Sequence, residues 1–206
     1  MREIRTWAWI LLFGSLWGIN EVMTGEFLFH NQVFLASVWL AAWAFFILAV
    51  GRGVVNRPGT SALIAAIAAG FKLVNGPPFY CHLLAIFLLG VGFDLAASLV
   101  LKKESRAAFR QGLTGVLGAY GGFALFALII TYVIRYKYWV AGGSAKVLEH
   151  IFVDGSVAAI VSAFLVPLGY RIGSVGWPAL ERHPRWSSAA AAAGVIILWI
   201  LGRMMS

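Results

Sequence analysis

Long apolar stretches follow one another along this chain, with only short polar breaks between them. A helix that crosses the hydrocarbon core of a membrane needs about 20 residues, because each residue adds about 1.5 Å along the helix axis. On that measure the sequence predicts seven spans, at residues 7–29, 33–51, 60–75, 79–101, 112–134, 148–170 and 187–204. The third span is short because Pro77 and Pro78 follow it closely. In an alternative with six spans, residues 189–193 lie at the membrane interface.

The composition excludes a soluble domain. Of the 206 residues, 61% are hydrophobic and 12% are charged, whereas soluble globular proteins have about 25% charged residues. A soluble domain of this length could not bury so much apolar surface, so the excess faces lipid. We therefore expect an all-α polytopic helix bundle that forms a single transmembrane domain over residues 1–206.

The distribution of positive charge predicts the orientation of the bundle, because cytoplasmic segments collect Lys and Arg. With a cytoplasmic N-terminus, the cytoplasmic segments hold most of the 16 cations, namely Arg2, Arg5, Arg52, Arg57, Lys102, Lys103, Arg106, Arg110, Arg171, Arg182 and Arg185. The other side and the spans share Lys72, Arg135, Lys137, Lys146 and Arg203. Seven spans then place the C-terminus outside, and six place it inside. No basic run with interleaved aromatic residues lies outside the spans, so we expect no nucleic-acid partner.

Ionisable side chains within the spans are the first candidates for a functional site, because charge is costly at membrane depth. On the predicted topology, several spans bring such groups to the outer side of the membrane. The candidate ligand-binding residues are Glu21, Lys72, Asn75, His82, His150 and Asp154. Two simpler explanations remain open: these groups approach water at the interface, or Lys72 pairs with a carboxylate inside the bundle. Asp94 lies apart from them, toward the cytoplasmic half.

Metal or haem binding is a further alternative. Glu26 with His30, and His150 with Asp154, are spaced four residues apart, so each pair shares a helix face and offers two metal ligands. Haem ligation would need two of the histidines at positions 30, 82 and 150. No known metal-binding motif is present, and the cofactor is left unassigned. The common catalytic and nucleotide-binding motifs are also missing, so we expect no enzyme.

Glycines mark the faces on which helices approach closely, because small residues allow backbone contact in lipid. The candidates are Gly14, Gly18, Gly115, Gly118 and Gly122. These faces serve either packing within the bundle or docking of a membrane partner subunit.

The segment from Arg135 to Ser144 combines two cations, three aromatic residues and the pair Gly142 and Gly143. We interpret its aromatic residues as an interfacial belt. The alternative is a lid over an anionic or aromatic ligand, hinged at the glycine pair.

A resemblance covers roughly residues 10–100. The motifs that carry it are Gly14-Ser-Leu-Trp-Gly18-Ile-Asn-Glu21 and Phe71-Lys72-Leu-Val-Asn75, followed by Pro77-Pro78 and an apolar stretch at 84–94. They resemble a family of uncharacterised bacterial integral membrane proteins with an L-W-G-x-x-E start. That family is similar to the substrate-binding S components of energy-coupling-factor transporters. The resemblance implies a multi-pass protein of the bacterial cytoplasmic (inner) membrane, with an outward-facing ligand cavity and a membrane coupling partner.

The first functional hypothesis is therefore a membrane-embedded substrate-capture subunit for uptake of a small solute or metal ion, in which Glu21 serves the ligand. Membrane lipid and partner subunits would surround it, and ATPase subunits would come from other chains because this sequence has no nucleotide-binding motif. The alternative is an anchoring subunit of a larger membrane complex, in particular a redox complex.

Overall fold

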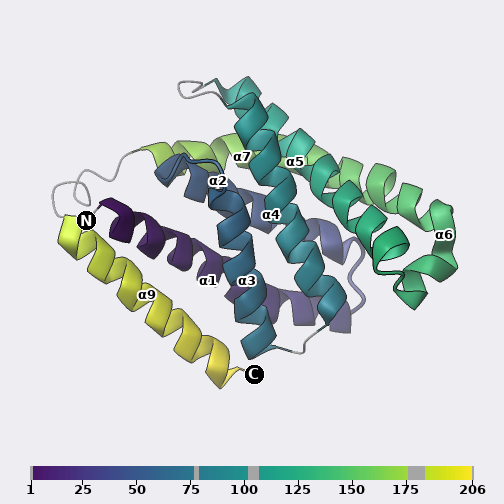
Figure 1. Cartoon of the computed structure of the whole chain (residues 1–206), viewed down its shortest axis with the longest axis horizontal. Coiled ribbons are helices and arrows are strands. Elements are labelled where there is room, and N and C mark those ends of the chain that lie inside the picture. The colour runs from purple at the N-terminus through teal and green to yellow at the C-terminus, as the bar shows by residue number, and fades with distance from the viewer. Residues whose placement is uncertain (1, 77–78, 102–106, 176–183, 206) are drawn as a thin grey trace.

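The computed structural model describes residues 2–76, 79–101, 107–175 and 184–205, and all regular secondary structure in these ranges is helical (Figure 1). The helices are α1 (Arg2–His30), α2 (Ala36–Val54), α3 (Thr60–Asn75), α4 (Tyr80–Val100), α5 (Ala108–Leu128), α6 (Lys137–Glu149), α7 (Gly155–Ser174) and α9 (Pro184–Met204). Two π-helical turns continue this order, η1 (Ile129–Val133) after α5 and η2 (His150–Asp154) before α7. The expected all-α fold is confirmed.

The length and apolar character of its helices indicate that the chain is a multi-pass membrane protein. In the described residues, five helical stretches are long and apolar enough to cross a membrane, namely Ala36–Val54, Tyr80–Val100, Ala108–Val133, Lys137–Ser174 and Trp186–Met204. Helix α3 is apolar but shorter. Helix α1 is long enough but carries charged residues near both of its ends.

Each predicted span corresponds to a helix, with ends that differ by a few residues. Helix α6 is the main addition, because the sequence predicted the sixth span only from residue 148 and an interfacial aromatic belt before it. Outside the described residues lie Pro77 and Pro78, together with the predicted cytoplasmic cations Lys102, Lys103, Arg106 and Arg182.

Six of the described helices close into a ring. Following the contacts around it, α1 packs on α3, α3 on α4, α4 on α5, α5 on α7, α7 on α2, and α2 again on α1. Helix α9 lies outside this ring and packs mainly along α1 (yellow beside purple in Figure 1). The buried core inside the ring is apolar and includes Trp17, Phe45 and Phe93.

The predicted packing glycines lie at contacts between helices of the ring. A Cβ on Gly14 or Gly18 would come within about 2.6 Å of side-chain atoms of α3. A Cβ on Gly115 would come 2.5 Å from the Ser162 carbonyl oxygen of α7, and Gly118 and Gly122 face α4. All five glycines therefore permit close packing within the chain itself.

Asp94 holds together the end of the ring at which α2 ends and α3 begins. Its carboxylate accepts hydrogen bonds from the backbone N–H groups of Gly59 (2.7 Å) and Ser61 (2.9 Å). These are donors that the start of helix α3 cannot satisfy internally. The buried Arg52 guanidinium lies 3.7 Å from the same carboxylate and also donates to the Arg57 carbonyl. We call this group of four residues (Arg52, Gly59, Ser61 and Asp94) the Asp94 clamp.

Candidate functional site

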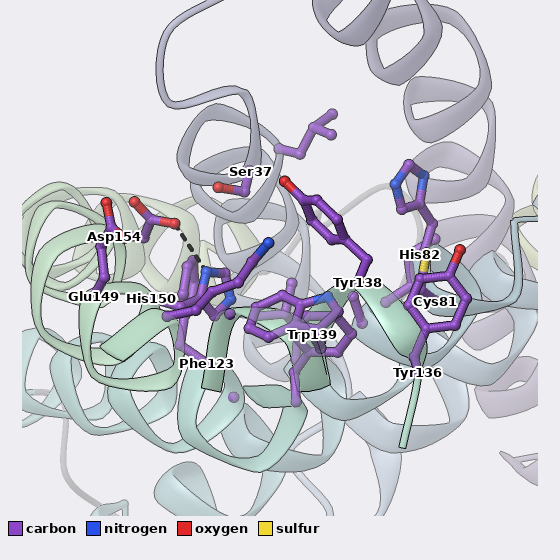
Figure 2. A pocket seen from close by; sticks show the side chains of 18 of the residues that line it. Ser37, Cys81, His82, Phe123, Tyr136, Tyr138, Trp139, Glu149, His150 and Asp154 are labelled. Atoms are coloured by element: carbon purple, nitrogen blue, oxygen red, sulfur yellow. Dashed lines mark hydrogen bonds and ion pairs between the residues drawn. The ribbon is translucent and has the colours of Figure 1, made fainter. Parts of the chain in front are cut away.

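A cavity of about 980 Å³ lies at the end of the bundle opposite the Asp94 clamp. Its walls come from the last part of α1, the first turns of α2 and α4, the last turns of α5, and from α6 and η2. These segments meet because successive helices run in alternating directions. Figure 2 shows side chains from several of them converging on this space.

Aromatic rings form one wall of the cavity around His150. The His150 ring centroid lies 4.8 Å from that of Phe123, 5.6 Å from Phe126 and 5.1 Å from Trp139. Phe126 and Trp139 meet edge to face at 5.1 Å. Rings at these distances attract one another beyond simple burial, so this wall is a preformed and well-packed surface.

The π-helical turn η2 presents His150 and Asp154 together. His150 Nδ1 lies 2.8 Å from Asp154 Oδ2, close enough to donate a hydrogen bond to the carboxylate. This bond selects the tautomer of a neutral ring, so that Nε2 is the hydrogen-bond acceptor. Single π-helical turns within α-helices are frequent at functional sites.

Helix α6 brings Tyr138, Trp139 and Lys146 to the cavity. Gly143 interrupts this helix with φ +59° and ψ −156°, a conformation that essentially only glycine adopts without strain. Lys146 folds back so that its Nζ lies 3.1 Å from the centroid of the Tyr138 ring and 5.1 Å from that of Trp139. The kinked helix thus supplies the cavity with both rings and a cation.

Glu21 reaches the cavity wall, but its carboxylate is held by the protein. Trp17 donates from Nε1 to Glu21 Oε1 at 3.0 Å, and Lys72 Nζ lies 3.2 Å from Oε2. The Lys72 ammonium also lies 3.3 Å from the Glu21 backbone carbonyl, and both charged side chains are buried. The pairing of Lys72 that the sequence left open is therefore present in this structure.

The six candidate ligand-binding residues divide into two groups. Glu21, His82, His150 and Asp154 line the cavity. Lys72 and Asn75 do not, because the face of α3 that carries them is covered by neighbouring helices. Asn75 is fully buried, donates to the Phe71 carbonyl at 2.9 Å, and lies against Gly202 of α9.

The weaker metal candidates are spread over the molecule. Glu26 and His30 are exposed at the end of α1 and do not line the cavity, whereas His150 and Asp154 pair with each other inside it. Among the described residues, no three His, Cys, Asp or Glu side chains converge in the way that a metal ion requires. For haem, His82 and His150 lie on opposite sides of the cavity (Figure 2).

Several cavity residues escaped the sequence analysis, including Ser37, Cys81, Phe123 and Phe126. Their types are common throughout a membrane helix bundle, so nothing in the local sequence separates them from lipid-facing neighbours. Tyr136, Tyr138 and Trp139 did carry a signal, because they lie in the segment for which a lid was the alternative interpretation. In the structure Trp139 is buried, whereas Tyr136 and Tyr138 remain exposed at the cavity margin.

Comparisons with protein-family models, curated proteins and solved structures give no match for this chain.

Proposed function

We propose that this chain is the membrane-embedded substrate-capture subunit of an uptake transporter for a small solute. The observation that carries the proposal is the cavity of about 980 Å³ at one end of the bundle, with a preformed aromatic wall and several ionisable side chains. Ligand pockets have volumes of about 300–1,000 Å³ and combine apolar walls with a few polar groups. A lipid-facing or purely structural bundle has no need of such a cavity.

In this proposal the N-terminus is cytoplasmic and the cavity opens toward the outside. The support comes from charge: on the predicted topology the segments on the clamp side hold 11 of the 16 cations, Arg52, Arg57, Arg110 and Arg171 among them, and the remaining five are Lys72, Arg135, Lys137, Lys146 and Arg203. An outward opening suits uptake, because the solute then meets its site from the external medium. The membrane is the cytoplasmic (inner) membrane of a bacterium.

The packing below the cavity implies that other subunits complete the transport cycle. Between the cavity and the Asp94 clamp, the described core is filled by apolar side chains such as Phe45, Leu48, Ile64 and Phe93. A solute bound in the cavity cannot cross this core without a large rearrangement. We therefore propose that a membrane coupling subunit and ATPase subunits drive the movement, and that this chain binds its solute without transforming it.

Purification in a mild detergent, followed by native mass spectrometry, tests the proposal. The wild-type protein is expected to carry a bound small molecule or to recover one from a cell extract. Ala145 and Ala141 provide matched variants, because both are exposed on α6 but only Ala145 lines the cavity. Ala145→Trp is expected to lose the bound solute, and Ala141→Trp is expected to keep it.

Two outcomes count against the proposal. If wild-type protein and both variants carry no small molecule and bind none, the cavity is not a solute site. If the chain instead co-purifies with redox subunits and shows haem absorbance, the anchoring role in a larger membrane complex replaces the capture role.

A further inference from the structure

One feature of the cavity is that the protein places a cation of its own on the aromatic rings. Lys146 Nζ lies 3.1 Å from the Tyr138 ring centroid and 5.1 Å from that of Trp139. A cation within about 6 Å of a ring centroid is attracted by the negative face of the ring. The lysine stem crosses the bare face of Gly142, where a Cβ would lie 2.5 Å from Lys146 Cδ. The geometry is therefore that of an occupied cation site.

The charges around this site also favour a cation. Glu149 and Asp154 line the same cavity, and within the described part of the chain Glu149 forms no ion pair. Asp154 forms a hydrogen bond with the His150 imidazole, and the Glu21 carboxylate is balanced by Lys72. Beside the His150 imidazole, the cavity is therefore lined by the two carboxylates of Glu149 and Asp154 and by the one ammonium of Lys146. The resulting negative potential attracts cations and repels anions.

The remaining walls fit an apolar or aromatic body. Leu40, Ile86 and Phe126 also line the cavity with apolar side chains. The volume of about 980 Å³ greatly exceeds what an ammonium group alone would fill. A solute that matches the whole cavity therefore combines a positive nitrogen with a larger hydrophobic part.

We infer that the captured solute is an organic cation with an aromatic or apolar body, and that its charged nitrogen replaces the Lys146 ammonium over Tyr138 and Trp139. This inference rests on the proposed capture function. The exchange is favourable because a lysine ammonium is strongly hydrated and returns readily to water on its flexible stem. A quaternary or heteroaromatic nitrogen is weakly hydrated and gains more from aromatic faces. Lys146 thus occupies the site until the solute displaces it.

Calorimetric titration with benzyltrimethylammonium tests this inference, with phenylacetate and benzyl alcohol as anionic and neutral probes of similar size. Wild-type protein is expected to bind the cation and neither of the other two probes. Lys146→Met removes the competing ammonium and is expected to tighten binding of the cation about tenfold. The increase in affinity is diagnostic, because Lys146→Met would instead weaken binding if Lys146 formed an ion pair with an anionic ligand.

Tyr138 supplies a matched pair of variants, since its side chain is 68% exposed and tolerates substitution. Tyr138→Leu removes the ring face and is expected to weaken binding of benzyltrimethylammonium about tenfold. Tyr138→Phe keeps the ring and is expected to bind as the wild type does. Equal affinities of the two variants would overturn the inference.

Two further results would overturn the inference but leave the proposed capture function standing. The capture function itself is tested by the solute that co-purifies with the protein. One is binding of phenylacetate that Lys146→Met abolishes. The other is failure of both the wild type and Lys146→Met to bind benzyltrimethylammonium while the wild type still carries a native solute.

Discussion

At the scale of single residues, the buried group of Trp17, Glu21 and Lys72 joins α1 to α3. The carboxylate has a partner for each oxygen, and the ammonium lies against both the carboxylate and a backbone carbonyl. Removal of one member of a buried ion pair leaves the other charge without compensation, whereas removal of both leaves no buried charge. The pair therefore behaves as a unit.

We predict that Lys72→Met destabilises the protein by about 3–5 kcal/mol, because it leaves the Glu21 carboxylate buried and unpaired. Glu21→Gln is expected to destabilise it as well, since Lys72 then keeps only amide and carbonyl partners. The double variant should unfold at a higher temperature than either single variant. Thermal unfolding of the three purified proteins in one detergent measures this, and additive losses would show that the two charges act independently.

The sequence revealed these charged residues but not all of their surroundings. Glu21, His82, His150 and Asp154 were found because ionisable groups are rare in membrane spans. Asn75 was misleading, since its position beside Lys72 gives no sign that α9 covers it. Phe123 and Phe126 could not be distinguished from other aromatic residues, because the side of a helix that faces the cavity depends on packing between distant segments.

At the scale of helices, α6 shows how a local conformation positions the site. Gly143 adopts φ +59°, and the bend places Trp139 beside the ring of Phe126 in α5. Sequence patterns predicted the apolar spans well because their length and hydrophobicity are local properties. They missed α6 because two adjacent glycines usually indicate a break rather than a kink within one helix.

Gly143→Ala is predicted to destabilise the protein by about 1–3 kcal/mol, since an alanine must adopt a strained backbone conformation there. Space is not the reason, because no atom lies within 4 Å of the position that a Cβ would take. Ser144→Ala is the control, at an exposed neighbour with ordinary helical backbone. Gly143→Ala should lower both the melting temperature and the affinity for solute, whereas Ser144→Ala should change neither. Unchanged values in Gly143→Ala would contradict the role of the kink.

A second prediction at this scale concerns the contact between α4 and α5. A Cβ on Gly92 would lie 2.5 Å from the Gly122 backbone nitrogen, so Gly92→Ala is expected to force the two helices apart and lower the melting temperature. Gly70 lies in helix α3 with no atom within 4 Å of its Cβ position. Gly70→Ala should therefore leave the melting temperature unchanged or raise it slightly. Equal losses in both variants would argue against close α4–α5 packing.

At the scale of the whole molecule, the two ends of the bundle differ in construction. One end holds the cavity, and the other is closed by the Asp94 clamp with its buried Arg52. The proposed orientation places the first end outside and the second in the cytoplasm. Under this proposal the solute reaches the cavity from the medium, and the clamp end faces the proposed subunits on the cytoplasmic side.

Labelling of introduced cysteines tests this orientation. In a Cys81→Ser background, which removes the one native cysteine, Asn31→Cys and Asn56→Cys place single thiols in exposed loops at opposite ends of the bundle. A membrane-impermeant maleimide is expected to label Asn31→Cys in intact cells. It should label Asn56→Cys only after the cells are permeabilised. The reverse pattern would place the cavity on the cytoplasmic side.

Helix α3 also has a consequence for how the protein is made. It is short, it carries Lys72 near its C-terminal end, and its first N–H groups depend on Asp94 of α4. A buried lysine opposes insertion, by about 2.5–3.5 kcal/mol at the centre of a span and by less toward its end, so its charge and its short length make α3 a poor substrate for the translocon by itself. Glu21 of the already synthesised α1 offsets that charge, and α4, which is synthesised next, supplies the missing acceptor. We therefore expect α3 to enter the bilayer together with its neighbours, as part of a three-helix unit assembled during translation.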